Sequence, residues 1–347
     1  MKKLLVFLIL LLPVNIFALS VPSNNAILYD ADNDRILYQK DINTKHLIAS
    51  TTKIMTAVIA IESGKLDDMV LVNESVLKSY GSGIYIKPGE KISLRNLVYG
   101  LMLRSGNDAA LMIEDYLGGH EKFISKMNEK ANELGMKNTT FENSNGLDES
   151  GELNYSTCYD MALLMKYALN LYDFREITST KKIDIKTNKN FYSWTNKNKL
   201  LFSYKYTTSG KTGYTKKSKR ILVTSAFKDD INLIVVTFVD KDDFNTHKTL
   251  YEYGFNTFKK YLILNKNKLK IDGYKNLYIK QNYYYLLKDN EKDKITTEVI
   301  MYDKKDKDEV GYIKVKFSNK IIHKEPLYKK EKSKVKTEKS IKNLFKF

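Results

Sequence analysis

The residues that could carry chemistry begin with the tetrad Ser50-Thr51-Thr52-Lys53. On a helix this spacing places the lysine one turn beyond the serine on the same face, within reach of its hydroxyl. A serine is a weak nucleophile until a base takes its proton, and a lysine kept neutral by burial or by nearby cations can be that base. The tetrad therefore indicates covalent catalysis by Ser50.

The tetrad alone is weak evidence, because the chain is rich in lysine. Its spacing recurs at three other places, which we interpret as chance: Ser75–Lys78, Ser179–Lys182 and Ser333–Lys336. Ser50 differs in context, because it comes just before the apolar run Ile54–Ile61 and is expected at the N-terminus of a buried helix. There the helix dipole and free backbone N–H groups favour developing negative charge.

Two further elements follow in order along the chain, Ser105-Gly106-Asn107 and Lys211-Thr212-Gly213. The order Ser-x-x-Lys, Ser-x-Asn and Lys-Thr-Gly is the signature of penicillin-binding proteins and serine β-lactamases. In that architecture the second element closes one side of a cleft, and the third lies on the strand that forms the other side. The three elements are therefore expected to converge on one site.

The chain from about Ala18 to Phe258 resembles the low-molecular-mass D-alanyl-D-alanine carboxypeptidases, the S11 family of serine peptidases that also bind penicillin. The resemblance rests on seven ordered stretches: Ile48–Thr56, Pro88–Glu90, Leu97–Met102, Ser105–Ala109, Asn145–Leu147, Tyr155–Thr157 and Lys211–Thr215. Chance agreement at so many ordered places is negligible.

The resemblance implies that Ser50 is the acylated nucleophile and Lys53 its base, although the sequence leaves the identity of the base in each step open. Ser105 and Asn107 would relay a proton and hold the substrate backbone. The reaction implied is acylation of Ser50 by the penultimate D-alanine of a peptidoglycan stem peptide, release of the terminal D-alanine and hydrolysis. No metal or organic cofactor is expected.

The resemblance further implies that Lys211, Thr212, Gly213 and Tyr214 form the substrate-binding strand. Lys211 and Thr212 would bind the terminal carboxylate of the peptide or of a β-lactam antibiotic. The backbone N–H groups of Ser50 and Tyr214 would form the oxyanion hole.

The family pattern is broken just after this strand. The family tends to have small residues there, whereas this chain has the basic run Lys216–Arg220. The departure puts the local substrate preference in question.

Three alternatives remain open. A class A β-lactamase needs a Glu-x-x-Leu-Asn element, but here Ser150 precedes Leu153-Asn154 where the glutamate would stand, and Glu149 is one residue off. We therefore predict slow release of penicillin. A DD-endopeptidase would use the same site on another substrate. A non-catalytic cell-wall or membrane-binding protein would not need the intact set of catalytic residues.

The elements that must position these residues follow from periodicity. An alternating run at Ala26–Gln39 predicts a β-hairpin, and two later runs predict strands, Arg220–Phe227 and Ile231–Val239. Helical patterns occupy six segments: Thr51–Ser63, Leu94–Leu103, Asp108–Leu117, Glu121–Leu134, Tyr159–Leu171 and about Asp243–Tyr261. The resulting fold class is α/β (α+β), a DD-peptidase/β-lactamase-like fold in which an antiparallel sheet is flanked by helices, with an all-helical lobe and a small C-terminal all-β domain.

Four parts are predicted along the chain of 347 residues: a signal peptide at 1–20, the catalytic domain at 21–264, the β domain at 265–328 and a basic tail at 329–347. Lys2 and Lys3 precede the apolar run Leu4–Leu12, which is too short for a spanning helix and is followed by a small-x-small cleavage pattern. Export to the cell wall or to the outer face of the cytoplasmic membrane is therefore expected.

The formal net charge of +17 favours anionic partners such as lipid headgroups and wall polymers. Nucleic acid is disfavoured, because no nucleic-acid-binding motif occurs beside the export signal. In the tail, Ile341, Leu344 and Phe345 have helical spacing among lysines, which predicts either a short helix on an anionic membrane or a solvated end.

The single cysteine, Cys158, excludes an intrachain disulfide and is expected to be a packing residue. The four histidines show no zinc-type spacing.

Overall fold

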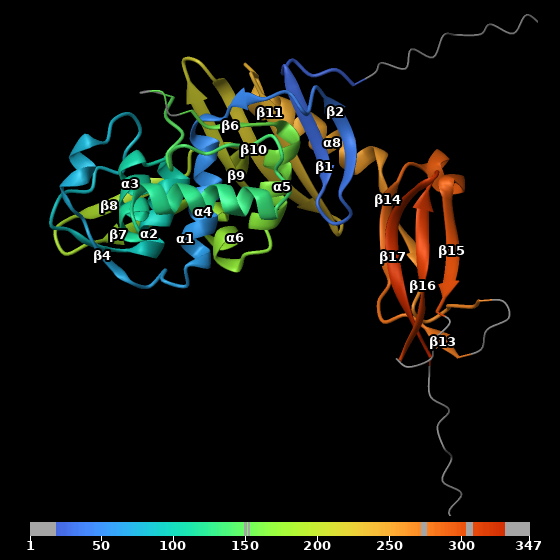
Figure 1. Cartoon of the computed structure of the whole chain (residues 1–347). Coiled ribbons are helices and arrows are strands. Elements are labelled where there is room, and N and C mark those ends of the chain that lie inside the picture. The colour runs from blue at the N-terminus through green and yellow to red at the C-terminus, as the bar shows by residue number, and fades with distance from the viewer. Residues whose placement is uncertain (1–18, 149–150, 152, 272–275, 303–307, 330–347) are drawn as a thin grey trace, which may run out of the picture.

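The computed structural model of the chain describes residues 19–148, 151, 153–271, 276–302 and 308–329 (Figure 1). A five-stranded antiparallel sheet, in the order β2-β1-β11-β10-β9, forms its centre. The strands are β1 (Asn25–Asp30), β2 (Arg35–Lys40), β9 (Thr207–Thr215), β10 (Lys219–Lys228) and β11 (Ile231–Phe238). Because β9 lies at the edge, one of its sides is unpaired in the sheet.

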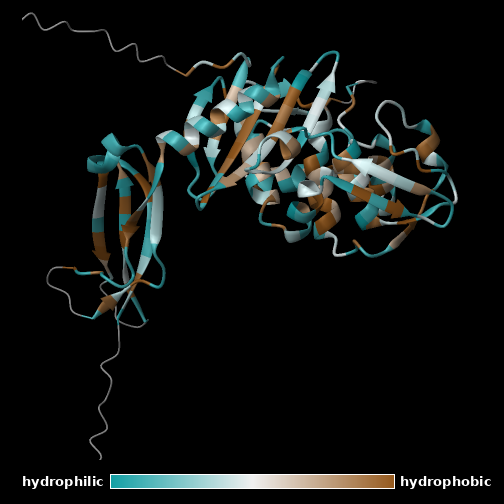
Figure 2. Ribbon diagram, turned by 180° about the vertical axis from the view of Figure 1, so that it is seen from behind, coloured by the Kyte–Doolittle hydropathy of each residue, from teal (hydrophilic) through white to brown (hydrophobic). Residues whose placement is uncertain are grey.

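Both faces of this sheet are covered by helices. On β1, Ile27 and Tyr29 belong to the core shared with α5 (Cys158–Ala168), whereas Leu28 packs on the other side with α8 (Asp243–Thr257). Successive side chains of a strand point to opposite faces, so a strand covered on both faces is apolar throughout. Figure 2 shows the apolar residues concentrated along these central strands and in the helices against them.

A mainly helical lobe is inserted between the hairpin β1–β2 and strand β9 (Figure 1). Its helices are η1 (Ala49–Thr52), α1 (Lys53–Glu62), η2 (Glu74–Lys78), α2 (Leu94–Tyr99), η3 (Gly100–Arg104), α3 (Asn107–Tyr116), α4 (His120–Glu133), α6 (Tyr172–Ser179) and α7 (Leu200–Ser203). Three two-stranded pairs brace it: β3 (His46–Leu47) with β6 (Tyr155–Ser156), β4 (Met69–Leu71) with β5 (Lys91–Ser93), and β7 (Lys182–Lys186) with β8 (Phe191–Thr195). Nine of the ten residues of α1 are buried, so this helix runs through the core of the lobe.

The lobe departs from the sequence-based expectations in two places. The helix expected over Leu94–Leu103 is divided, because the regular helix α2 passes into the π-helical turn η3. The helix expected to end at Leu171 ends at Ala168, and a separate helix α6 that periodicity did not reveal follows it.

A small β domain follows α8 (Figure 1). It consists of a β12–β14 pair and a four-stranded sheet in the order β13-β17-β16-β15. The elements are β12 (Lys259–Leu264), β13 (Leu277–Tyr278), β14 (Tyr283–Leu287), η4 (Asp289–Lys294), β15 (Ile295–Met301), β16 (Glu309–Phe317) and β17 (Lys320–Lys329). The expected fold class is confirmed.

The expected helix to Tyr261 is wrong over its last residues. Helix α8 ends at Thr257, and β12 pairs with β14 instead of continuing the helix. Leu264 belongs to the apolar core of the small domain. We therefore propose that the β domain begins at β12, earlier than the predicted boundary between 264 and 265.

The predicted signal peptide lies almost wholly outside the described residues, as do 330–347 of the basic tail. Within the described ranges, no helix is long and apolar enough to cross a membrane.

Candidate active site

Ser50 lies in the 3₁₀ turn η1, which leads directly into α1. Its side chain is half-buried, so the hydroxyl is held by the fold but remains accessible. One turn further along, Lys53 Nζ donates a hydrogen bond to Ser50 Oγ at 3.2 Å. The predicted contact between Ser50 and Lys53 is therefore present in the structure.

Lys53 is fully buried and has two further partners besides Ser50. Its Nζ donates to Asn107 Oδ1 at 2.7 Å and to the backbone carbonyl of Asn145. Burial, and then the positive charge of Lys197, lowers the pKa of Lys53 to about 7, although Asp108 opposes the shift. A large fraction of Lys53 is consequently a neutral amine near neutral pH, as a general base requires.

The Ser-x-Asn element lies where η3 turns into α3. Ser105 has left-handed backbone angles, φ 63° and ψ 37°, which are uncommon for a residue other than glycine and cluster at functional sites. Asn107 begins α3, and its Nδ2 donates to the Tyr80 carbonyl at 2.7 Å. The Asn107 amide is thus anchored on one side and receives the Lys53 hydrogen bond on the other.

The loop that holds Asn107 is fastened by a buried carboxylate. Asp108 accepts hydrogen bonds from the backbone N–H groups of Ile84, Tyr85 and Ala109, at 2.6 to 3.1 Å. Such charge-assisted bonds are stronger than neutral ones. Asp108 therefore ties the segment of Ile84 and Tyr85 to the start of α3, next to Asn107.

Lys211 lies on the edge strand β9 and faces the lobe. Its side chain is 2% exposed, and Nζ donates to Ser105 Oγ at 3.0 Å and to the Thr212 carbonyl at 2.7 Å. Burial, then the charges of Lys53 and Lys197, lowers the pKa of Lys211 well below its usual value. The three sequence elements thus meet at one place, with Lys53 and Lys211 close enough to repel each other.

Strand β9 runs close to the turn η1 that carries Ser50, which explains why a residue without a side chain stands at Gly213. A Cβ atom at Gly213 would lie 3.2 Å from the Ile48 carbonyl oxygen and 3.3 Å from the Thr51 nitrogen. Tyr214 follows with a side chain that is 63% exposed, so its backbone is the part of the residue nearest the site.

The orientation of the Tyr214 N–H group follows from its neighbour. The N–H of Thr215 donates to Ser218 Oγ in the turn toward β10. Because backbone N–H groups point alternately to the two sides of a strand, the N–H of Tyr214 points to the free edge of β9. It is available there to an incoming carbonyl oxygen.

The loop carrying Asn145 packs against the turn η1. Gly146 has φ 80°, and a Cβ atom there would overlap the Ala49 carbonyl oxygen at 1.9 Å. Asn154 holds the loop, because its Nδ2 donates to the Asn143 carbonyl and to Thr52 Oγ1, both at 2.9 Å. Asn154 therefore has a structural role here, while Glu149 and Ser150, weighed above for a lactamase, lie outside the described residues.

Three contributors escaped the sequence reasoning. Lys197 acts on the pKa of both lysines, but it stands in a polar run without any motif. Asn145 belongs to a stretch that carries the resemblance, but it was assigned no role, because it acts through its backbone carbonyl and residue type gives no signal for that. Asp148 accepts from Thr215 Oγ1 at 2.6 Å and so joins the Asn145 loop to the end of β9.

The other candidates lie apart from this site. Ser75 Oγ donates to Asp115 and Ser179 Oγ to the Glu176 carbonyl, both on the surface, and Ser333 lies outside the described residues. Cys158 is fully buried, in agreement with a packing role. In the part of the chain that the structure describes, no group of three or more histidine, cysteine or acidic residues could hold a metal ion.

The family profile described as D-alanyl-D-alanine carboxypeptidase matches residues 14–243, and that of the penicillin-binding protein 5 C-terminal domain matches 248–335. The D-alanyl-D-alanine carboxypeptidase DacF of Bacillus subtilis is 36% identical over 223 residues, 62% of this chain and 57% of that protein. DacB2 of Mycobacterium tuberculosis is 30% identical over 240 residues, 67% of this chain and 82% of that protein.

Among solved structures, penicillin-binding protein 6B of Escherichia coli superposes with a TM-score of 0.72 at 26% identity. The match covers 90% of this chain and 97% of that one, so the likeness includes the C-terminal β domain.

Proposed function

The chain belongs to the D-alanyl-D-alanine carboxypeptidase family, and from that premise we propose that it removes the terminal D-alanine from peptidoglycan stem peptides through an ester on Ser50. The observation that carries the proposal is the 3.2 Å contact between Lys53 Nζ and Ser50 Oγ, at a buried lysine whose pKa is lowered to about 7. A solvated lysine would be almost wholly protonated at neutral pH and could not accept the serine proton.

In the proposed acylation step, Lys53 takes the proton of Ser50 while Oγ attacks the carbonyl carbon of the penultimate D-alanine. The negative charge that forms on the carbonyl oxygen is met by the N–H groups of Ser50 and Tyr214. The peptide C–N bond then breaks, and the proton held by Lys53 passes through Ser105 to the leaving nitrogen of D-alanine. Asn107 holds the substrate backbone and the Lys53 side chain.

In the proposed deacylation step, a water molecule attacks the ester carbonyl and gives its proton to Lys53. The ester bond breaks, and Ser50 recovers its proton. A β-lactam would acylate Ser50 in the same way, but its leaving group stays attached after the ring opens. We therefore propose that penicillin remains bound to Ser50 as a long-lived ester.

The role proposed for Lys211 depends on a change of charge. In the free site, burial and the neighbouring Lys53 lower its pKa, which disfavours the cation. The carboxylate of a bound peptide favours the cation instead. Lys211 would therefore gain a proton as substrate binds, and with Thr212 it would hold the carboxylate beside Gly213.

The predicted location rests on the sequence. We propose that 1–20 is a signal peptide, that the mature chain acts in the cell wall or at the outer face of the cytoplasmic membrane, and that the tail contacts anionic lipid. Peptidoglycan lies outside that membrane, so the location fits the substrate.

The decisive experiment incubates the purified mature chain with a fluorescent penicillin and, separately, with a pentapeptide ending in D-Ala-D-Ala. Stable labelling and D-alanine release are expected, and both should be lost in Ser50→Ala. Ser179→Ala is the matched control, because Ser179 has the same spacing to a lysine but an exposed side chain.

The alternatives give different results in the same experiment. Rapid turnover of penicillin would identify a β-lactamase, and cleavage confined to cross-linked peptides would identify an endopeptidase. If the folded wild-type chain neither binds penicillin nor releases D-alanine, the catalytic proposal fails and a binding protein becomes the better description.

A further inference from the structure

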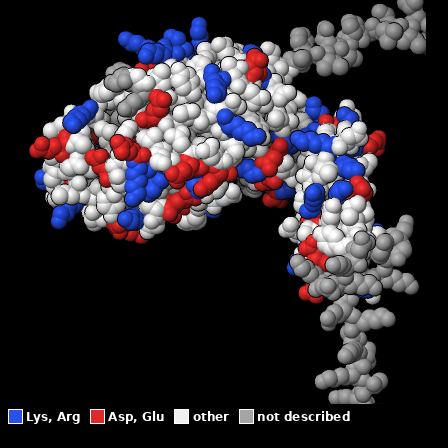
Figure 3. Space-filling model, viewed as in Figure 1, with Lys and Arg blue, Asp and Glu red and all other residues white. Residues whose placement is uncertain are grey.

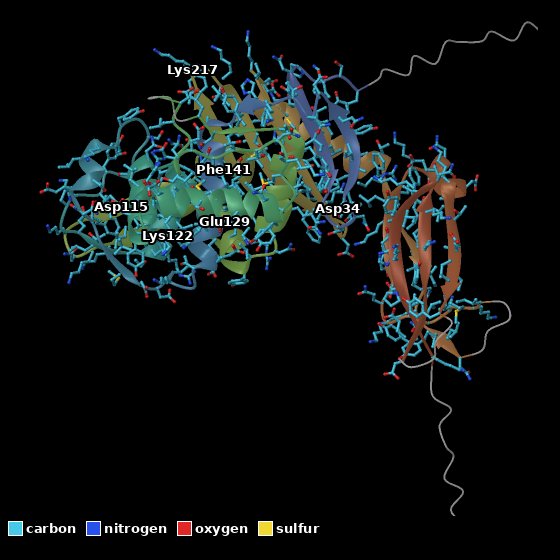
Figure 4. All side chains as sticks on the ribbon, in the orientation of Figure 1. Asp34, Asp115, Lys122, Glu129, Phe141 and Lys217 are labelled. Carbon is cyan, nitrogen blue, oxygen red and sulfur yellow. The ribbon has the colours of Figure 1, made fainter. Side chains whose placement is uncertain are left out.

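The turn between β9 and β10 presents lysine side chains at the end of the strand that is proposed to bind substrate. Lys216, Lys217 and Lys219 are all exposed. Figure 4 places Lys217 at the outer edge of the molecule, and Figure 3 shows basic side chains gathered at the same edge. These lysines belong to the basic run Lys216–Arg220, which begins directly after β9.

The turn is built as a fixed element. Thr215 and Ser218 are joined by three hydrogen bonds. The Thr215 N–H donates to Ser218 Oγ at 3.0 Å, the Ser218 N–H donates to Thr215 Oγ1 at 2.9 Å, and the two hydroxyl oxygens lie 2.8 Å apart. Ser218 is fully buried, and Thr215 Oγ1 also donates to Asp148 at 2.6 Å. The backbone that carries the lysines is therefore fixed relative to the loop that carries Asn145.

Two of the basic groups in this run already have partners. Arg220 is paired with Asp243 at 2.7 Å, and Lys217 Nζ donates to the Asp148 carbonyl at 3.0 Å. Lys216 and Lys219 have no carboxylate within ion-pair distance among the described residues. Glu149 and Glu152 follow Asp148 in the sequence and fall outside those residues. Within the described part of the chain, Lys216 and Lys219 are therefore the basic groups of this turn without an ion-pair partner.

The direction of the substrate follows from the proposed roles along β9. The terminal carboxylate would lie at Lys211 and Thr212, and the carbonyl to be attacked would lie at the Tyr214 N–H. A peptide on the free edge of a strand continues along it, as in β-strand addition. The residues that precede the penultimate D-alanine would therefore extend toward Lys216.

The spacing agrees with a short upstream segment. Lys216 is the first residue of the turn after β9 and follows Tyr214 by two residues, so the two Cα atoms are at most about 7 Å apart. A substrate side chain one to three residues before the penultimate D-alanine would reach the turn.

We propose that Lys216 and Lys219 form a subsite for a carboxylate in this upstream part of the peptide. The enzyme would then prefer stem peptides that carry an acidic side chain before the penultimate D-alanine. The inference rests on the proposed carboxypeptidase function and names the substrate preference of that site. Exposed ion pairs are individually weak and are screened by salt. The subsite would thus adjust selectivity without being needed for the chemistry.

The test uses N-acetyl pentapeptides ending in D-Ala-D-Ala that differ only by Glu or Gln at one of the first three positions. D-alanine release is measured as kcat/KM for the full mature chain, for Lys216→Gln/Lys219→Gln, and for the control Lys266→Gln/Lys320→Gln. The control makes the same change of net charge at exposed lysines of the C-terminal β domain. Acylation by benzylpenicillin, which lacks an upstream peptide, reports on the catalytic groups.

For the wild type, kcat/KM for the peptide with Glu at one of these positions should exceed that for the Gln peptide by about three- to tenfold at low salt. This is the size of effect expected of two exposed ion pairs. The preference should shrink in about 0.5 M salt and vanish in Lys216→Gln/Lys219→Gln, with unchanged benzylpenicillin acylation. The control variant should keep it.

Equal rates on Glu and Gln peptides, or a preference that survives in Lys216→Gln/Lys219→Gln, would overturn the inference while leaving the carboxypeptidase function intact. The inference is also overturned if the two substitutions alter only the retention of the protein on anionic wall polymer. If the wild type releases D-alanine from none of the peptides, the result instead contradicts the proposed function.

Discussion

Lys53 Nζ and Asn107 Oδ1 lie 2.7 Å apart although 54 positions separate the two residues in the chain. The hydrogen bond joins the first residue of α1 to the first residue of α3 and holds the amine beside Ser50. Asn107 is itself anchored by its hydrogen bond to the Tyr80 carbonyl, so the amine position is set by two elements of the lobe.

Acylation should depend on the neutral form of Lys53. Because burial lowers its pKa to about 7, the second-order rate constant for labelling by fluorescent penicillin should rise tenfold per pH unit below that value and level off above it. Lys53→Arg, whose guanidinium stays charged, should lose about 10²- to 10⁴-fold. The measurement is the labelling rate between pH 5 and 9, and a rate that stays flat down to pH 5 would exclude Lys53 as the base.

Gly146 should be required for acylation because of the space it leaves. Gly146→Ala would press a methyl group against the Ala49 carbonyl and displace the Asn145 carbonyl from Lys53. A shift of about 1 Å can cost about 100-fold in rate, so a loss of at least that size is expected in penicillin labelling. Gly119→Ala is the matched control, since Gly119 has a similar φ of 82° but nothing within 4 Å of the added atom. Equal losses in both variants would attribute the effect to backbone strain alone.

Arg35 should hold the C-terminal β domain against the catalytic domain. Its Nη2 donates to both carboxylate oxygens of Glu291, at 2.8 and 2.9 Å, and its guanidinium lies over the rings of Phe258 and Phe317. Both charged side chains are nearly buried, at 10% and 12% exposure, so removing one leaves the other unpaired. Figure 4 labels the neighbouring Asp34 at the end of the β1–β2 hairpin that faces this domain.

Arg35→Ala is accordingly expected to speed limited proteolysis between the domains without changing penicillin labelling. The rate is followed by gel electrophoresis of the fragments. Lys259→Ala serves for comparison, because its pair with Asp289 is open to solvent at 61% and 62% exposure and should contribute little. Unchanged cleavage in Arg35→Ala would show that other contacts hold the domains.

His247 should make the protein less stable in acid. It is fully buried between Thr224 and Thr237, and burial lowers its pKa to about 3. Below about pH 6.5 the unfolded chain binds a proton at this histidine, whereas the folded chain leaves it neutral. The contribution of neutral His247 to the free energy of unfolding is therefore complete above that pH and is lost as the pH falls toward 3. Between pH 7 and pH 5 this amounts to about 2 kcal/mol of unfolding free energy.

The measurement is urea unfolding of the wild type and His247→Gln at both pH values. The substituted protein should lose less stability between pH 7 and pH 5 than the wild type does, whatever its stability at pH 7. His120→Gln, at a side chain that is 47% exposed, is the comparison. If His247→Gln and the wild type lose the same stability, the histidine does not carry the effect.

Local patterns were reliable guides to the elements that carry the site. The apolar run after Ser50 predicted the buried helix α1, and the alternating runs predicted β10 and β11, because their periodicity comes from the faces that these elements bury. The local patterns failed at the end of α8, because the aromatic and lysine residues that follow this helix could either continue it or start a strand. The pairing of β12 with β14 decided that point, and no local signal records it.

The sequence by itself determined which side chains we propose for the reaction and in what order they occur, because a recognisable series is formed by Ser50, Lys53, Ser105, Asn107 and Lys211. Only the tertiary structure decided their chemical state. Burial of Lys53 and Lys211, the charge of Lys197 and the carbonyl of Asn145 come together through packing between segments far apart in the chain. A lysine becomes a base when the fold removes the water that would keep it charged, and desolvation is a property of the assembled core.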